Sequence, residues 1–241
     1  MANWSTCALC GEFNELRMSH IFPEFFYRDL YDEKHRAVSV TPATNRTRWL
    51  QKGLRQRLLC AQCEAQLSRY ETYAATTLRK LQRIPGPDTP GSYLELCDVD
   101  YARFKLFQLS LLWRVSVSND PAFCGVSVGP HEEKVRRHLV QDDPGEQYDY
   151  MCLLATLRRP HRLGQMLPPP REVKLRGHRT ILMVAAGLFW LFKTSHHVSG
   201  FPFAGDAIGP GRPLRVGILS HSEQDVLEFL GREMEEGAAG D

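Results

Sequence analysis

Three kinds of signal are missing from the sequence. The N-terminus has no basic segment followed by an apolar run, so we expect no secretory signal and a cytoplasmic location. The longest apolar run, Ile181–Phe192, has 12 residues, which is too short for a membrane-spanning helix, and we expect no membrane partner. The second half contains no phosphate loop, nucleophile elbow or paired carboxylates, so nothing in it indicates an enzyme.

Excess charge of either sign is also missing. The 241 residues include 30 Lys and Arg against 28 Asp and Glu, for a net charge of +2. Any affinity for nucleic acid must therefore come from a local basic patch and not from the charge of the whole chain. A hydrophobic content of 43% is ordinary for a globular protein, and the length allows one large domain or two modest ones.

One stretch separates the chain into two parts. Ile84–Ser92 contains three prolines and two glycines in nine residues, so it cannot continue a helix or a central strand. We predict an N-terminal domain over residues 1–83, a linker over 84–92 and a second domain over 93–241. The alternative is a long surface loop inside a single domain.

The hydrophobic periodicity predicts an α+β fold. Before the linker we expect a short strand at Met18–Pro23, a helix beginning at Pro23 and a long helix over Gln62–Arg83. After it, Asp98 or Asp100 is expected to cap a helix whose apolar stripe runs from Tyr101 to Val115, with Arg103, Lys105, Gln108 and Arg114 off the stripe. The remaining expected elements are a short helix at His131–Leu139, strands at Tyr150–Leu157, Glu172–Leu175, Ile181–Phe192 and Leu214–Leu219, and a final helix at Gln224–Met234. The second domain thus combines an antiparallel sheet with flanking helices.

Four of the seven cysteines form two C-x-x-C pairs, Cys7 with Cys10 and Cys60 with Cys63. In a reducing compartment such pairs indicate metal or redox chemistry before a disulfide. Two thiolates three residues apart can reach one tetrahedral centre, and two pairs complete it, so we predict one structural Zn²⁺ ion. A redox dithiol and an iron–sulfur cluster are the alternatives. The unpaired Cys97, Cys124 and Cys152 are expected to be buried apolar residues.

The residues between and after the two pairs resemble the zinc-stapled HNH (ββα-metal) endonucleases. Ser19-His20-Ile21-Phe22-Pro23 is similar to that family's first strand, and Leu58–Glu64 is similar to its second knuckle, over residues 4–75 in all. The resemblance implies a ββα or treble-clef fold in which His20 is the general base. It also implies Glu64 as a ligand of a catalytic Mg²⁺ or Mn²⁺ ion, and a bacterial defence or mobile-element setting. The rest of the chain resembles bacterial proteins without an assigned function.

The sequence departs from that family at three positions. Glu64 stands where a histidine or asparagine ligand is expected, although a carboxylate oxygen suits magnesium or manganese. Ser19 stands where an acid or histidine usually helps to hold the catalytic metal, and Arg55 stands where an asparagine is expected. For His20 the alternative is a structural histidine whose ring hydrogen-bonds a neighbouring carbonyl. For Glu64 the alternative is an exposed acid in the first turn of a helix, where the helix dipole favours a negative charge.

The stretch between the two knuckles is the best candidate for contact with nucleic acid. Residues 45–57 contain five basic side chains, one tryptophan and no acid. Arginine and lysine can neutralise phosphates, and tryptophan can stack on a base. The predicted nucleic-acid-binding residues are Arg46, Arg48, Trp49, Lys52, Arg55 and Arg57. The alternative is a solvated loop with Trp49 packed inward.

Two main hypotheses of function follow. The first is a metal-dependent HNH-type endonuclease acting on DNA through His20 and Glu64. The second is a non-catalytic zinc-binding module that binds nucleic acid or a protein partner, motivated by Ser19 and Arg55. A third hypothesis assigns the function to the second domain, with a small ligand or partner near Ile181–Phe192.

Overall fold

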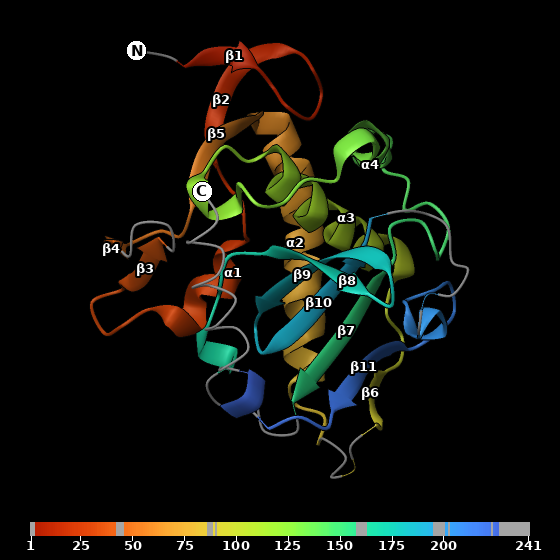
Figure 1. Ribbon diagram of the computed structural model, residues 1–241. Helices are drawn as coiled ribbons and strands as arrows, with labels where there is room; N and C mark the ends of the chain where they lie inside the picture. The colour runs from red at the N-terminus through yellow and green to blue at the C-terminus, as the bar shows by residue number, and fades with distance from the viewer. Residues whose placement is uncertain are drawn as a thin grey trace.

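The computed structural model describes residues 3–41, 46–85, 89, 91–157, 163–194, 201, 203–222 and 224–226. For residues 39–41 and 46–48 it describes the backbone alone. The predicted final helix Gln224–Met234 lies almost wholly outside these residues, as does part of the predicted linker. Within the described part, helices and mainly antiparallel sheets give the mixed α+β architecture that the sequence predicts (Figure 1). No described helix has the length and apolar character needed to cross a membrane.

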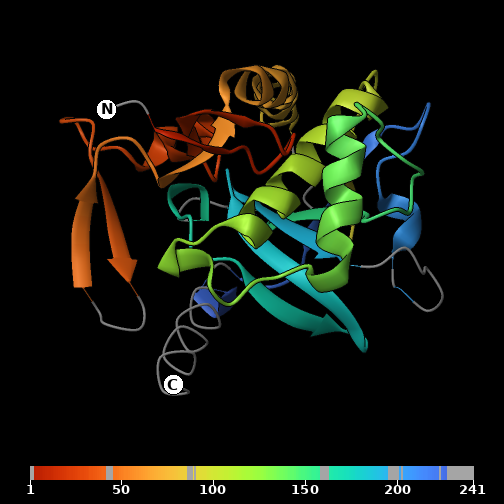
Figure 2. The same cartoon turned by 90° about the horizontal axis from the view of Figure 1, so that it is seen from above.

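The N-terminal part is built on a three-stranded sheet in the order β1-β2-β5. Its strands are β1 (Trp4–Thr6), β2 (Phe13–His20) and β5 (Arg55–Cys60), and helix α2 (Ala61–Leu81) follows β5 directly. Between β2 and β5 the chain forms α1 (Glu24–Tyr27), the 3-10 helix η1 (Arg28–Leu30) and a hairpin of β3 (Ala37–Thr41) with β4 (Arg46–Leu50). This hairpin projects from the side of the molecule (Figures 1 and 2).

The C-terminal part is a six-stranded sheet in the order β6-β11-β7-β10-β9-β8. The strands are β6 (Tyr93–Leu96), β7 (Cys152–Leu157), β8 (Arg171–Leu175), β9 (His178–Ala185), β10 (Leu188–Lys193) and β11 (Leu214–Leu219). All neighbours are antiparallel except β7 and β11, which are parallel. The helical elements are α3 (Tyr101–Val117), α4 (Glu132–Val140) and the 3-10 helices η3 (Pro121–Phe123), η4 (Gly129–His131), η5 (Leu163–Gln165) and η6 (Ala204–Asp206).

The run Ile181–Phe192 is not the single strand that the sequence predicts. It contains most of β9 and β10, which form a hairpin that turns at Ala186 and Gly187. Both residues have positive φ, 54° and 73°, as a tight two-residue hairpin turn requires. The apolar character continues through the turn because both strands are buried, so the run shows no polar interruption.

Helix α3 begins as predicted, with the Asp100 carboxylate accepting a hydrogen bond from the Arg103 amide at 3.0 Å. Three polar residues of α3 are more buried than a position off the apolar stripe indicates. Lys105, Gln108 and Arg114 lie off the apolar stripe, yet all three are buried because α3 packs against α2, α4 and the sheet. The helix is therefore surrounded by protein on more than its apolar face.

One hydrophobic core contains residues of both predicted domains. Phe26 of α1 lies 6.2 Å from Phe107 of α3 and 5.8 Å from Trp190 of β10, measured between ring centroids. The division at residues 84–92 stays a prediction, but the two parts share this core. Cys97 and Cys124 are exposed, contrary to the expectation, and Cys152 is buried as expected.

Candidate metal centre and nucleic-acid surface

The two C-x-x-C pairs meet in space. One ligand atom from each of Cys7, Cys10, Cys60 and Cys63 lies within 4.8 Å of the other three. The Cys10 and Cys60 sulfurs are 4.0 Å apart, and a tetrahedral ion with Zn–S bonds of about 2.3 Å requires a sulfur separation of roughly 3.8 Å. The four thiols can therefore hold a structural metal such as zinc without rearrangement of the backbone.

Local backbone geometry prepares the thiols to bind an ion. Although burial opposes ionisation of Cys7, the backbone amides of Cys10, Cys60 and Leu9 hydrogen-bond its sulfur and lower the pKa of its thiol. The Cys60 amide donates to the Cys7 sulfur at 3.3 Å. Burial and the neighbouring thiols raise the pKa of Cys63 in the metal-free chain. Several thiolates cannot share this small volume without a cation, so the site favours one.

Secondary structure positions each of the two C-x-x-C pairs. The first lies in the turn between β1 and β2, closed by Gly11 at a φ of 80°. The second spans the junction of β5 and α2, with Cys60 as the residue before the helix. Arg136 of α4 donates a hydrogen bond to the Leu9 carbonyl, so the C-terminal part also contacts the first turn.

Ser19 and Glu64 are joined directly. The Ser19 hydroxyl donates to a Glu64 carboxylate oxygen at 2.6 Å, and Ser19 is fully buried. The resemblance to HNH nucleases implies that an acid or histidine at position 19, together with the residue at position 64, would help to hold a catalytic ion. In this chain the Ser19 hydroxyl contacts the Glu64 carboxylate instead.

His20 makes different contacts. Its Nε2 atom lies 2.8 Å from a Glu24 carboxylate oxygen and 3.1 Å from the Lys52 carbonyl oxygen. Because both neighbours are acceptors, Nε2 must carry a hydrogen, which leaves Nδ1 as the accepting nitrogen of the neutral ring. The Tyr31 hydroxyl donates to the other Glu24 oxygen at 2.8 Å, so Glu24 is itself held in place. The carbonyl contact is the one expected of a structural histidine, and the half-buried position leaves a base role open.

The structure does not bring His20 and Glu64 to one metal site. Successive side chains of a strand point to opposite faces, so His20 points away from the face on which Ser19 meets Glu64. Among the described residues, the four cysteines are the single group of three or more His, Cys, Asp or Glu side chains close enough to share an ion. The residues present thus do not form a catalytic metal site by themselves, and the roles of His20 and Glu64 stay predictions.

The basic stretch does not form one loop. Its first part is β4, paired with β3, and its last part opens β5. Asn45 lies outside the described residues, and so do the side chains of Arg46 and Arg48. Trp49 is not packed inward, because 57% of its surface is exposed.

The remaining predicted contact residues differ in exposure. Lys52 is exposed, and Arg55, the first residue of β5, is half-buried. Arg57 is exposed, although its guanidinium donates to the Leu16 carbonyl oxygen at 3.2 Å. The stretch thus carries at least two cations toward solvent beside the hairpin.

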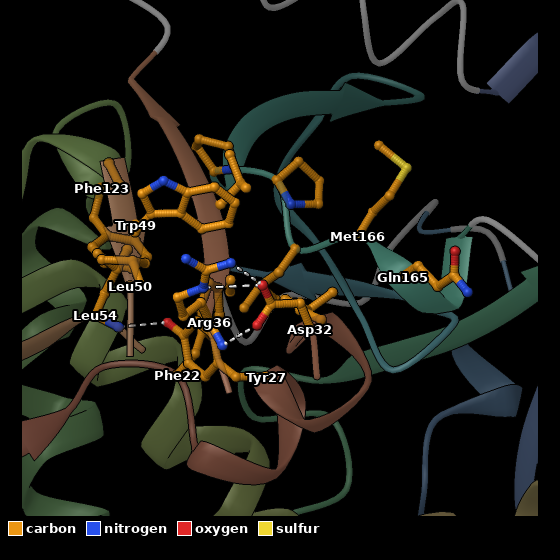
Figure 3. A pocket seen from close by; sticks show the side chains of 17 residues that line it. Phe22, Tyr27, Asp32, Arg36, Trp49, Leu50, Leu54, Phe123, Gln165 and Met166 are labelled. Carbon is orange, nitrogen blue, oxygen red and sulfur yellow. Dashed lines mark hydrogen bonds and ion pairs between the residues drawn. The ribbon is translucent and has the colours of Figure 1, made fainter. Parts of the chain in front are cut away.

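A cavity of about 470 Å³ opens beside Trp49 (Figure 3). One side is formed by the β3–β4 hairpin and the segment that leads to it, including Arg36, Val38 and Leu50. The other side is formed by residues 165–169, and the floor includes Phe22 and Phe123. The cavity is mainly apolar and lies where the two parts of the chain meet.

Two polar side chains in the cavity are held rigidly. Asp32 accepts hydrogen bonds from the Nε and Nη2 atoms of Arg36 at 3.0 and 2.7 Å. The Arg36 guanidinium lies over the Trp49 ring, 4.4 Å from its centroid. The Tyr27 hydroxyl accepts from the Leu54 amide at 3.0 Å and fixes the chain after β4.

Sequence reasoning missed several of these residues. The spacing of Asp32 and Arg36 by four residues is a detectable signal for an ion pair. Glu24 follows Pro23 in the first turn of a helix, where an acid is common for local reasons, so its contact with His20 gave no distinct signal. Arg114 donates to the His20 carbonyl oxygen at 2.9 Å from 94 residues away in the sequence, and no local sequence pattern indicated this contact.

No protein-family model, no curated protein and no solved structure matches the chain. The likeness to HNH nucleases therefore depends on the motifs alone, and the metal-binding geometry of the four cysteines stands independently of it.

Proposed function

We propose that this chain is a zinc-organised module that binds nucleic acid through the β3–β4 hairpin and the start of β5. The observation that carries the proposal is Trp49, an exposed aromatic ring with an arginine over one face, in a stretch that has five basic residues and no acid. Protein surfaces that hold nucleic-acid backbones combine these two features, because cations neutralise phosphates and aromatic rings stack on bases.

The Ser19–Glu64 hydrogen bond supports binding without cleavage. In a ββα-metal nuclease the corresponding side chains would hold a divalent ion, whereas Ser19 supplies a neutral donor at 2.6 Å. Four thiolates in tetrahedral reach suit Zn²⁺, and we assign the ion a structural role because all four positions are filled by protein.

The test is binding of fluorescent single-stranded and duplex DNA and RNA, measured by anisotropy at several salt concentrations. The double variant Lys52→Gln and Arg55→Gln should weaken binding and reduce the slope of log K against log salt by about 2, one for each lost phosphate contact. Lys174→Gln, which removes an exposed lysine of β8 in the other part of the molecule, is the matched control. Equal loss in the control, or no binding to any of these probes, would contradict the proposal.

A second candidate is the nuclease that the motifs suggest, and the orientation of His20 favours it. With Nε2 donating to Glu24 and the Lys52 carbonyl, Nδ1 can take a proton from water as the hydroxide attacks phosphorus, the P–O bond breaks and the leaving oxygen takes a proton from solvent. A divalent ion, when bound, would stabilise the phosphate charge. The motifs name Glu64 as the carboxylate for such an ion, but its hydrogen bond to Ser19, on the face of β2 opposite His20, counts against this candidate.

Nicking of supercoiled plasmid with Mn²⁺ or Mg²⁺ separates the two candidates. The nuclease hypothesis expects cleavage that His20→Ala abolishes and Lys174→Gln leaves unchanged. Cleavage that survives His20→Ala in pure protein would show that His20 is not the base. Binding without cleavage under every metal would leave the binding module as the function.

A further inference from the structure

We propose that the cavity beside Trp49 takes one unpaired base of a single strand, which makes single-stranded nucleic acid the preferred ligand. This inference rests on the proposed nucleic-acid binding and adds to it which class of nucleic acid is bound and where one base lies. Four observations carry it: the exposure of Trp49, the position of Arg36, the shape of the cavity, and the charge around its mouth.

Trp49 is prepared for stacking. Its indole is 57% exposed although it is one of the largest apolar side chains, and Arg36 lies 4.4 Å from the ring centroid. The Asp32 carboxylate accepts two hydrogen bonds from this guanidinium, which orients Arg36 over the ring in the absence of a ligand (Figure 3). A rigid, solvent-exposed aromatic ring loses little conformational entropy when a base stacks on it.

The cavity has the size and composition of a small-ligand site. Its volume of about 470 Å³ falls in the range of roughly 300–1,000 Å³ that is typical of such pockets. Its walls are mainly apolar, from Val38 and Leu50 on the hairpin to Pro168 and Pro169 opposite. Gln165, at the far side, adds an amide that can donate to and accept from a base edge.

The walls explain why the base must be unpaired. The hairpin and residues 165–169 come from distant parts of the sequence and enclose the space from two sides. A base inside a duplex is stacked on both faces and hydrogen-bonded along its edge, so it cannot enter such a space without leaving the helix. Extruding it costs the free energy of unstacking and unpairing, whereas a single strand offers its bases without that cost.

The charge near the cavity selects nucleic acid over an apolar ligand or peptide. Leu50 lines the cavity, and the exposed Lys52 and half-buried Arg55 follow within five residues. No acidic residue occurs between Asn45 and Arg57. A base in the cavity would therefore have its flanking phosphates near cations, which is the complementarity that single-strand-binding grooves use.

The experiment compares two tryptophans of equal exposure. Trp4 on β1 is also 57% exposed, but it stacks on Phe13 in the other hairpin and lies outside the cavity. Trp49→Ala and Trp4→Ala are each titrated against labelled 20-nucleotide oligo-dT, oligo-U and a 20-base-pair duplex. Trp49→Ala should weaken single-strand binding about tenfold, the loss expected for one stacked base, and leave duplex binding unchanged. Trp4→Ala should change neither.

Fluorescence gives a second readout in the folded wild-type cavity. In a Trp4→Phe background, Trp49 is the one exposed tryptophan, because Trp113 and Trp190 are buried, and oligo-dT should quench its emission. Equal affinity of Trp49→Ala and Trp4→Ala for single strands, with the Lys52 and Arg55 effect intact, would overturn the cavity inference alone. Wild-type preference for the duplex would overturn it as well. Failure of every probe to bind would overturn the proposed function with it.

Discussion

The thiol cluster and the six-stranded sheet hold their surroundings together in different ways. Around the cluster, a three-residue strand, one turn and the start of a helix converge on four sulfurs within 4.8 Å of one another. In the sheet, the strands β7, β9 and β10 are buried over most of their length and pack against α3. The first region has the ligands to be held together by an ion, whereas the second is held together by apolar burial.

The two regions are not independent. The aromatic side chains that follow β2 pack on the second region: Phe22 lies 5.3 Å from Phe123, and Phe26 lies 5.8 Å from Trp190, between ring centroids. Arg114 of α3 adds a polar connection, because it donates to the His20 carbonyl oxygen and to Glu71. Loss of a bound metal should unfold the thiol region first, and these contacts determine how far the destabilisation reaches into the apolar region.

Removal of the metal is the largest expected effect. Cys63→Ser, or a chelator on the wild type, should abolish binding of one zinc equivalent and cost several kcal/mol of local stability. Hydrogen exchange should then accelerate in β1, β2 and β5, whereas β7, β9 and β10 keep their protection. Elemental analysis and exchange mass spectrometry measure the two outcomes.

The exposed cysteines provide the control for that experiment. Cys97→Ser and Cys124→Ser remove thiols outside the cluster and should change neither metal content nor exchange. Wild-type protein that contains no metal and is equally protected in β2 would show that the cluster is not a structural site.

Breaking the polar connection between the two regions should have the next largest effect on stability. Arg114 is 1% exposed, and its Nη1 atom lies 2.6 Å from a Glu71 oxygen. Arg114→Met leaves Glu71 and the His20 carbonyl without this donor, and loss of one partner of a buried pair costs about 3–5 kcal/mol. Urea unfolding should show a loss of this size, or two separate transitions.

Arg103 offers a matched control on the same helix. It is 64% exposed in its side chain and pairs with Asp100 at 3.3 Å, so Arg103→Met should cost less than about 1 kcal/mol. If the two variants are equally stable, Arg114 does not connect the regions.

The same contrast explains what the sequence could predict. The thiol cluster is a local pattern repeated once, so its spacing alone predicted the four ligands, and the Asp100 cap was equally local. The two-residue alternation of a strand predicts that Ser19 and His20 point to opposite faces, but it does not identify Glu64 and Glu24 as their partners.

Contacts between distant segments could not be predicted in this way. Arg114 was predicted to lie off the apolar stripe, and nothing local in the sequence indicates that α2 covers that side of the helix. The cavity beside Trp49 has the same origin, since Gln165 and its neighbours reach it from more than 100 residues away. The β9–β10 turn was missed because Gly187 lies within a continuous apolar run.

The smallest expected effect concerns a cation inside the apolar region. Lys105 is 1% exposed, and its Nζ atom donates to the Asp149 carbonyl oxygen at 2.5 Å with no carboxylate bound to it among the described contacts. Burial lowers the pKa of Lys105 to about 8, whereas an unfolded lysine titrates near 10.4. Between these values the unfolded chain binds a proton that the folded chain has released, so this residue makes stability rise with pH in that window.

Lys105→Met should remove that rise. From pH 7 to pH 10, the unfolding free energy of the wild type should rise by on the order of 2 kcal/mol relative to that of Lys105→Met. Urea titrations at several pH values measure it, and Lys134→Met, at an exposed position of α4, should run parallel to the wild type. Because buried tyrosines such as Tyr27 have raised pKa values and weaken every variant at high pH, the difference between curves is the informative quantity. Parallel curves for Lys105→Met and wild type would mean that the lysine remains charged in the folded protein, and that the apolar region tolerates a buried cation on carbonyl contacts alone.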